Sequence, residues 1–316
     1  MTSYDLCLAW NWEYDADFVK VLSKACRSHG LSLLQVMPDN LGDLLHRLVN
    51  QDIVFRVFFD RASEDDACFM PLVRWVCRCG THSINAYEQA SRTWDKATMH
   101  QALIGAGLCV PYTIILPSYE EQPVLPSVDL RPLGARFTIK PAHGGGGRGV
   151  VTEATSLSQV LVARREYPSD RYLLQTHIVP QELGFRPAWF RVICCMDQIY
   201  PCWWNPHTHI YAPVTFAEET RYGLQPLFDM TASIARLCGL DLFSTEIALA
   251  PDGLFLVVDY VNDQIDLRLQ SKVADGVPDQ IVHRIAERLA EVVAAYRQPA
   301  AGHQDRACDG PLRTRT

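Results

Sequence analysis

The sequence predicts a mixed α/β and α+β protein, in which an open parallel α/β domain precedes two α+β units. Strand-like and helix-like segments alternate through residues 1–90, a pattern typical of a parallel sheet. From Arg136 onward strand signals dominate, and Pro251-Asp252-Gly253 marks a tight turn between two apolar runs. The chain has 316 residues, 48% of them hydrophobic, which is enough for about two or three compact units.

The first 90 residues justify the open parallel sheet. Strands are expected at residues 4–10, 31–37 and 53–60, with helices at about 15–29 and 40–50. Ligands of such sheets bind at the carboxyl ends of the strands. Polar residues at these ends are Asn11, Glu13, Asp60 and Arg61. They are either substrate contacts or ordinary polar loop residues, and the sequence leaves both interpretations open.

Residues 91–135 are expected to connect this domain to the rest of the chain. Ser91 is expected to begin a helix whose apolar period ends at Gly105, and a strand follows at residues 112–116. The segment from Tyr119 to Leu133 is rich in proline and acidic residues, which predicts a loop.

Two strand-rich units are expected beyond residue 136. A small unit at 136–180 should contain strands at 137–140, 149–154 and 172–178 and a helix at about 156–165. A third unit at 181–298 should contain strands at 189–196, 198–204, 243–250 and 254–261, and helices at 226–238 and 278–297. The turn at Pro251 predicts that the last two strands pair as an antiparallel hairpin. Residues 299–316 are polar and aperiodic, so we expect a disordered tail there.

A glycine-rich segment joins the first two strands of the 136–180 unit. Lys140 and Pro141 end a strand, Gly144–Gly147 follow, and Arg148 precedes the next apolar run. Adjacent glycines lose much backbone entropy on folding, and they allow backbone N–H groups to approach a ligand closely. Basic residues beside such a loop indicate phosphate binding, whereas a plain hairpin turn needs fewer glycines and no lysine. The segment matches neither the P-loop nor the dinucleotide-binding fingerprint.

Two acidic residues lie on the expected final hairpin. Glu246 belongs to one strand, and Asp259 lies near the end of the next strand, before Asn262. Acids on paired strands can face the same side, and carboxylate oxygens that share a cation with phosphates suit Mg²⁺. A buried acid needs a partner, which either a metal or an arginine or lysine would provide. Beside the glycine loop, the metal is the favoured interpretation.

Composition excludes several classes of function. The net charge of −7 argues against nucleic acid as a partner, since binding to a phosphate backbone needs a basic face. No apolar run reaches about 18 residues, so no membrane span is expected. The start of the chain lacks the pattern of a signal peptide, and a cytoplasmic location is expected. The 11 cysteines are scattered, without the paired spacing of zinc ligands.

The order of these motifs resembles the ATP-grasp superfamily. Members most like the chain are carboxylate–amine ligases such as glutathione synthetase, D-alanine–D-alanine ligase and the ribosomal-protein glutamate ligases. The resemblance covers about residues 90–270 and rests on Asp95-Lys96, Ile139-Lys140-Pro141, LLQTHI, Phe190-Arg191-Val192, STEIAL and VVDYVN. It implies a two-subdomain ATP-grasp fold, preceded by a pre-ATP-grasp α/β domain that residues 1–90 match in pattern.

The resemblance also implies roles for the matching residues. Lys96 and Lys140 would bind the nucleotide phosphates, and Lys140 and Arg191 would act in catalysis. The phosphate-covering loop would be formed by Gly144, Gly145, Gly146 and Gly147. The hinge beside adenine would be formed by Gln175, Thr176, His177 and Ile178, with Glu182 at the ribose. Mg²⁺, with Mn²⁺ as an alternative, would be held by Glu246, Asp259 and Asn262. Arg268 would contact an acyl phosphate or simply pair with Asp266.

Two departures from the family pattern concern the metal site. Many relatives carry Glu-x-Asn at the second metal position, whereas this chain has Asp259-x-x-Asn262. A β-bulge could restore the geometry, or Asp263 or Asp266 could contribute instead. The Asn-Pro continuation that is usual in the family is also absent.

The activity that the resemblance implies is an ATP- and Mg²⁺-dependent ligation. A carboxylate would be activated as an acyl phosphate and joined to the amine of an amino acid or peptide, with release of ADP. The partners would be a small carboxylate and an amine, with a homodimer as a possible assembly. The alternatives are a kinase of a small alcohol and a nucleotide-binding protein that lacks ligase chemistry. Within residues 201–216, four side chains either line an acceptor pocket or belong to a packed insertion: Trp203, Trp204, His207 and His209.

Overall fold

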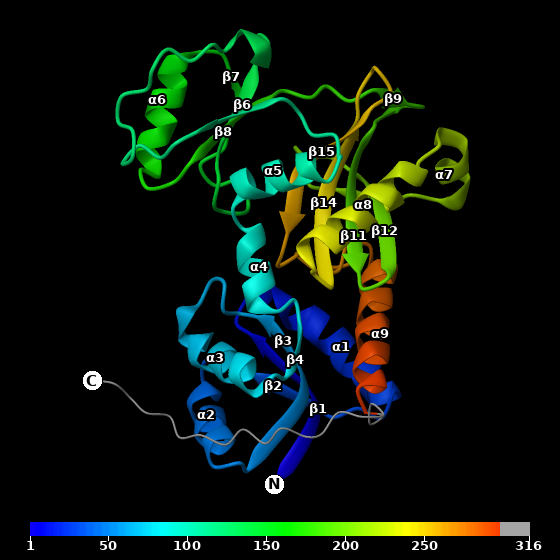
Figure 1. Ribbon diagram of the computed structural model, residues 1–316. Helices are drawn as coiled ribbons and strands as arrows, with labels where there is room; N and C mark the ends of the chain where they lie inside the picture. The colour runs from blue at the N-terminus through cyan, green and yellow to red at the C-terminus, as the bar shows by residue number, and fades with distance from the viewer. Residues whose placement is uncertain (298–316) are drawn as a thin grey trace. The chain divides into compact units, whose positions relative to one another are not determined.

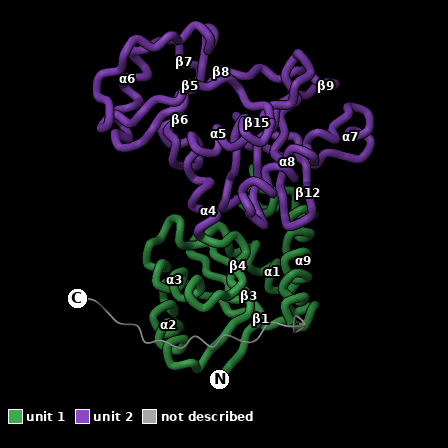
Figure 2. The backbone as a smooth tube through the Cα atoms, in the orientation of Figure 1, with its two compact units in different colours: residues 1–87, 266–316 green, residues 88–265 purple. Residues whose placement is uncertain are grey.

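The computed structural model describes residues 1–297, which divide into two compact units (Figure 2). Unit 1 comprises residues 1–87 and the described residues from 266 onward, and unit 2 comprises residues 88–265. The tail expected at 299–316 lies outside the described residues. Within residues 1–297, no helix has both the length and the apolar character needed to cross a membrane.

Unit 1 is built on the open parallel sheet that the sequence predicts. Its strands are β1 (Thr2–Trp10), β2 (Leu33–Val36), β3 (Ile53–Arg61) and β4 (His82–Ile84). They lie in the order β2-β1-β3-β4, and each adjacent pair is parallel. The register pairs Cys7 of β1 with Leu34 of β2 and Phe58 of β3, so successive strands align their apolar residues.

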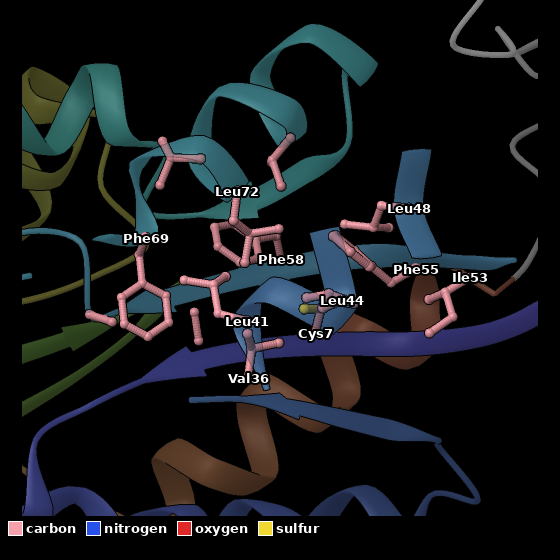
Figure 3. Close-up of a cluster of buried hydrophobic side chains, with 14 residues drawn as sticks. Cys7, Val36, Leu41, Leu44, Leu48, Ile53, Phe55, Phe58, Phe69 and Leu72 are labelled. Atoms are coloured by element: carbon pink, nitrogen blue, oxygen red, sulfur yellow. The ribbon is translucent and has the colours of Figure 1, made fainter. Parts of the chain in front are cut away.

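Helices cover this sheet with their apolar faces. They are α1 (Ala16–Ser28), α2 (Leu41–Val49), α3 (Met70–Cys79) and α9 (Asp279–Ala295), with 3₁₀ turns η1 (Glu13–Asp15) and η2 (Ala67–Phe69). Figure 3 shows Leu44 of α2 and Leu72 of α3 packed with Cys7 and Phe58 of the sheet. The helix α9 packs against α1 instead (Figure 1). The structure therefore groups α9 with unit 1, whereas the sequence placed residues 278–297 in the third unit.

A buried carboxylate, that of Asp5, ties β1 to the end of α9. Arg297 donates from Nε to Oδ1 and from Nη2 to Oδ2, both at 2.7 Å, and the backbone N–H of Ser32 donates to Oδ2 at 2.7 Å. The hydrogen bonds from Arg297 hold the pKa of Asp5 well below its usual range. A carboxyl group whose pKa is lowered by folding stabilises the fold above about pH 4, and this contribution is lost as the pH falls.

We expect Asp5→Asn to lower the free energy of unfolding by about 2 kcal/mol at pH 7, because charge-assisted hydrogen bonds are lost from a buried position. The difference from the unaltered protein should shrink at pH 3, where part of the stabilisation is already lost. Urea unfolding at both pH values measures it. The control is Asp43→Asn, whose carboxylate is 73% exposed and lies 3.8 Å from Arg47. An equal loss at both pH values would show that the charge of Asp5 is not responsible.

The first sheet of unit 2 is antiparallel and has the order β5-β8-β6-β7. Its strands are β5 (Thr113–Leu116), β6 (Phe137–Pro141), β7 (Val151–Ala154) and β8 (Tyr172–Thr176), with the helix α6 (Leu157–Glu166) and the 3₁₀ turn η3 (Arg131–Leu133). Phe137, Leu174 and Val160 of α6 share its core. The glycine loop joins β6 to β7, as predicted, while the predicted strand at 172–178 already ends at Thr176.

The second sheet of unit 2 has five antiparallel strands in the order β13-β12-β11-β14-β15. They are β11 (Trp189–Cys195), β12 (Gln198–Trp204), β13 (Tyr211–Pro213), β14 (Leu242–Leu249) and β15 (Phe255–Asn262). The predicted antiparallel hairpin is confirmed as β14 and β15. The helix α8 (Gln225–Cys238) packs on β11 and β12. The sequence did not predict the short elements β9 (Glu182–Leu183), β10 (Arg186–Pro187), β13 and α7 (Phe216–Tyr222).

The helix expected from Ser91 to Gly105 is wrong, because two helices occupy this segment. They are α4 (Tyr87–Thr93) and α5 (Lys96–Gly105). Asp95 lies between them in an extended conformation, with φ −86° and ψ 97°, and its side chain accepts the backbone N–H of Ala97 at 3.0 Å. An aspartate that caps the second helix cannot also continue the first, so the chain breaks there. The break places Lys96 on the first turn of α5.

Candidate functional site

Two carboxylates meet on the hairpin of unit 2. Glu246 of β14 lies directly opposite Asp259 of β15, and Ser244 lies opposite Asn262. One residue lies between Ser244 and Glu246 on β14, whereas two lie between Asp259 and Asn262 on β15, so β15 bulges there. The irregularity that the Asp-x-x-Asn spacing requires is therefore present in the strand pairing. The amide of Asn262 donates to the carbonyl of Ser244 at 3.4 Å.

Glu246 is held by two donors from the neighbouring strand β11. The Nε1 atom of Trp189 donates to Oε2 at 3.0 Å, and Nη1 of Arg191 donates to Oε1 at 3.2 Å. Arg191 also donates from Nε to the hydroxyl of Ser244 at 3.1 Å. The ion pair that the sequence left open as an alternative partner of the acids therefore exists for Glu246. Its presence does not exclude a metal, since each carboxylate oxygen accepts more than one contact.

The electrostatics of the two acids differ. Burial raises the pKa of Glu246, and Asp259 adds to the rise, while Arg191, Trp189 and Lys140 oppose it. Burial by itself would raise the pKa of Asp259, but the positive charges of Lys140, Lys96 and Arg191 and the hydrogen bond from Asn262 lower it overall. Two carboxylates on directly opposite residues of paired strands repel one another when both are ionised, and a divalent cation would relieve that repulsion.

The residues present fit a magnesium ion that is shared with phosphates. Within residues 1–297, no group of three or more His, Cys, Asp and Glu side chains has the geometry of a metal site. Mg²⁺ is usually bound through one or two carboxylates, with phosphate oxygens and waters completing its coordination. Glu246 and Asp259 supply two carboxylates, and Asn262 adds an amide oxygen, which matches that donor set.

Lys140 of β6 extends toward the same hairpin. Only 7% of its surface is exposed, and its Nζ atom donates to the carbonyl of Val258 at 3.1 Å and lies 5.4 Å from the ring centre of Tyr260. Burial lowers the pKa of Lys140, and the charges of Asp259 and Glu246 oppose this change. Lys140 of the four-stranded sheet therefore contacts β15 of the five-stranded sheet, next to the carboxylate of Asp259.

Lys96 and the glycine loop also meet. The Nζ atom of Lys96 donates to the carbonyl oxygen of Gly144, so the first turn of α5 reaches the start of the loop. Gly144, Gly146 and Gly147 have φ angles of 110°, 62° and 73°. These values lie in the left-handed region that only glycine adopts at low cost, which explains the run of glycines. Gly144 to Gly147 are exposed, and within the loop the N–H groups of Arg148 and Val150 donate to the carbonyls of Gly145 and Gly147 at 3.3 Å and 3.2 Å.

Of the four residues predicted to form the adenine hinge, Gln175 directs its side chain into the core. Gln175 is buried on β8, and its Nε2 atom donates to the hydroxyl of Tyr260 at 3.0 Å, where Nδ1 of His100 also lies at 2.7 Å. Its side chain therefore supports the core. Thr176 ends β8, and the other predicted contacts, His177, Ile178 and Glu182, follow it, with His177 and Glu182 exposed. Only their backbone or exposed side chains are left to contact a nucleotide.

Arg268 lies in unit 1 and is engaged there. Its guanidinium forms ion pairs with Asp266, at 2.6 Å, and with Asp275, at 2.9 Å. The hydrogen bond that Arg268 donates to the carboxylate of Asp266 is the main cause that raises the pKa of Arg268. The pairing with Asp266 is the alternative that the sequence left open. A contact between Arg268 and an acyl phosphate stays a prediction.

The aromatic segment at 201–216 divides between the two faces of its sheet. Trp203 packs in the core, with its ring centre 4.8 Å from that of Phe190. The next residue, Trp204, faces the other way, with its ring 5.0 Å from the guanidinium of Arg191 and 5.4 Å from the stacked ring of His209. Side chains alternate along a strand, so the packed-insertion interpretation fits Trp203, and Trp204 and His209 lie beside Arg191. The side chain of His207 is exposed.

Sequence reasoning missed Trp189, which donates to Glu246, and Ser244, which accepts from Arg191. A signal was available, because side chains two residues apart on a strand share a face, which links Trp189 to Arg191 and Ser244 to Glu246.

The polar ends of β1 and β3 have partners inside unit 1. Arg61 is buried and donates to Asp15 at 2.6 Å.

Neither a model of a known family nor a curated protein matches the sequence. Solved structures do match its fold. A RimK domain ATP-grasp protein from Sphaerobacter thermophilus has a TM-score of 0.62 at 19% identity, over 90% of this chain and 98% of that one. D-alanine–D-alanine ligase from Bacillus anthracis, complexed with ATP, has a TM-score of 0.62 at 12% identity, over 94% and 98%. The ATP-grasp ligase PsnB, complexed with minimal precursor, Mg and ADP, has a TM-score of 0.62 at 13% identity, over 94% and 99%.

The class of structure follows from these matches and from the two units described above. A parallel sheet in unit 1 and antiparallel sheets in unit 2 make a mixed α/β architecture. The chain has the ATP-grasp fold. The prediction made from the order of the sequence motifs is thereby confirmed for the fold.

Proposed function

We propose that the protein is an ATP- and Mg²⁺-dependent ligase that joins a substrate carboxylate to an amine. The observation that carries the proposal is the convergence of Lys140, Arg191, Glu246 and Asp259, from four strands of two sheets, into one set of interacting charges. Such a set suits a reaction in which two anions must approach each other. D-alanine–D-alanine ligase and PsnB, which share the fold, are ATP-grasp-type ligases, and this similarity supports ligase chemistry for the present protein.

The proposed reaction has two steps. A carboxylate oxygen of the first substrate attacks the γ-phosphorus of ATP, and the bond to the bridging oxygen breaks, so that ADP leaves. The amine of the second substrate then attacks the carbonyl carbon of the acyl phosphate and loses a proton, and inorganic phosphate departs. No nucleophile from the protein is required, so positioning and charge stabilisation account for the rate.

The residues of the chain would divide this work between them. Lys96 and Lys140 would bind the phosphates, and Arg191, held by Ser244 and Glu246, would offset the charge that develops during transfer. When bound at Glu246, Asp259 and Asn262, Mg²⁺ would supply positive charge to the phosphate oxygens. The glycine loop after Lys140 would close over the nucleotide and exclude water, because an acyl phosphate hydrolyses when it is exposed. Backbone groups at Thr176, His177 and Ile178 would contact adenine, and Glu182 the ribose.

Turnover by the full chain tests the proposal. ATP and Mg²⁺ are supplied with pooled carboxylates, pooled amines or both, and the release of ADP and inorganic phosphate is measured. We expect release of both products only when a carboxylate and an amine are present together. Hydroxylamine in place of the amine should trap an acyl hydroxamate. A phosphorylated alcohol without free phosphate would instead indicate a kinase. Absence of ADP release together with absence of binding heat for Mg-nucleotide would overturn the proposal.

A further inference from the structure

The dipeptide Asp170-Arg171, which immediately precedes β8, contacts two elements of the proposed nucleotide site. The carboxylate of Asp170 accepts the backbone N–H of His143 at 2.8 Å and pairs with Nδ1 of the same residue at 2.9 Å. His143 directly precedes Gly144, the first residue of the glycine loop. The side chain of Asp170 is only 11% exposed although His143 is largely exposed. The nearly buried carboxylate of Asp170 therefore holds His143, the residue before the glycine loop.

Arg171 holds the other element, the first turn of α5. Its guanidinium pairs with the carboxylate of Asp95 and donates from Nη2 to the hydroxyl of Thr98 at 3.0 Å. Asp95 is the N-cap of α5, and its carboxylate accepts the hydroxyl of Thr98 at 2.7 Å. The residue between the cap and the rest of the turn is Lys96. Arg171 thus sets the position of the turn from which Lys96 extends.

Backbone hydrogen bonds close a ring through the same segments. The N–H of Lys96 donates to the carbonyl of Ala142 at 2.8 Å, and the N–H of Ala142 donates to the carbonyl of Arg171 at 2.8 Å. Ala142 is fully buried and lies two residues before Gly144. Asp95 therefore meets Arg171 through side chains while Lys96 meets Ala142 through the backbone. These contacts connect the backbone of Lys96 and the segment that leads into the glycine loop to residues 170 and 171.

We propose that Asp170 and Arg171 are positioning residues for nucleotide binding. They act by fixing the position of His143, which precedes the glycine loop, relative to Lys96. This inference rests on the proposed function, since it gives Lys96 and the loop their phosphate ligand. A lysine held at its backbone loses less conformational freedom on binding than one on a frayed helix end. The simpler alternative is that the cap and the ion pair only stabilise α5. Partly exposed ion pairs contribute about 1 kcal/mol or less to stability, so that alternative predicts a small change in unfolding and none in affinity.

A double-mutant cycle distinguishes these two roles. Binding of Mg-ADP to the full chain is measured by calorimetry for the unaltered protein, for Arg171→Ala, for Lys96→Ala and for the double variant. We expect Arg171→Ala to weaken binding at least about 10-fold, but to weaken it less than about 3-fold when Lys96 is already absent, because residues that act together are not additive. Arg171→Lys should restore only part of the affinity, since lysine lacks the planar fork of arginine.

The matched control removes another ion pair of unit 2. Arg136→Ala breaks an exposed pair with Glu153, whose two atoms lie 2.9 Å apart, and should leave affinity unchanged. Equal losses from Arg171→Ala in both backgrounds, or a fall in melting temperature with unaltered affinity, would overturn the positioning role while leaving the proposed function intact. If the unaltered protein bound no Mg-nucleotide, the proposed function would fail as well, so the two failures are distinguishable.

Discussion

Replacing Lys140 with methionine is expected to reduce ATP turnover by at least about 100-fold, because one preorganised donor at a developing charge contributes about that factor. Methionine suits the site because Lys140 is buried and its burial lowers its pKa, so an unbranched apolar side chain of similar length keeps the packing. The hydrogen bond to the carbonyl of Val258 is lost, at a cost of about 1 kcal/mol of stability. Steady-state release of ADP and a melting curve measure both effects.

A lysine elsewhere on the chain provides the control for this variant. The side chain of Lys20 is 75% exposed and pairs with Asp17 one turn away on α1. Lys20→Met should therefore leave turnover within about twofold, since surface substitutions remote from a site have small effects. If a folded Lys140→Met protein turned over ATP at the normal rate, the assignment of Lys140 to the phosphate-binding site would be wrong.

The second large effect is expected from Glu246→Gln, which should weaken the response of turnover to Mg²⁺. Glutamine keeps the shape of the side chain and can still accept the hydrogen bond from Trp189, but it removes a charge from the proposed metal site. We expect a loss of at least about 100-fold at millimolar Mg²⁺, because a cation that neutralises phosphate charge contributes several kcal/mol to the transition state. Titration of ADP release with Mg²⁺ measures this loss.

The variant also separates metal binding from the ion pair with Arg191. If Glu246 acts only as a partner of Arg191, the Mg²⁺ titration should keep its midpoint and lose amplitude alone. If Glu246 binds the metal, the midpoint should move to higher Mg²⁺ concentration, and Asp259→Asn should move it as well. Glu153→Gln, at an exposed side chain of β7, is the matched control and should change neither quantity. An unchanged midpoint in both Glu246→Gln and Asp259→Asn would contradict the metal assignment.

Long elements with strong patterns were predictable from the sequence. The strands β1, β3, β14 and β15 and the helices α1 and α8 lie within a few residues of their expected positions. Each has a sustained apolar run or a helical period, and a clear breaker at its end. The short elements were not predictable. Two-residue strands such as β9 and β10 have no period to detect, and their pairing depends on the sheet that supports them.

Within the site, residue type was predictable but partnership was not. Lys140 could be assigned to phosphates because glycines follow it, and Glu246 and Asp259 to a metal because they lie on two strands that were expected to pair. The ion pair between Glu246 and Arg191 depends on the register of β11 against β14, which pairs these two residues directly. Gln175 was predicted to lie beside adenine because it belongs to the LLQTHI motif. Its side chain instead donates a hydrogen bond to Tyr260, a residue 85 positions later.

The amino-acid sequence alone determined the fold class, the glycine loop and the residue types of the proposed phosphate and metal site. These are local properties, set by composition and by the period of apolar side chains along each element. Only the tertiary structure decided which charges face each other: Arg191 against Glu246, Lys140 at Val258, and Asp170-Arg171 across both the loop base and α5. Such contacts join residues far apart in the chain, and strand register, bulges and helix caps bring them together. No pattern within a single segment encodes those distances.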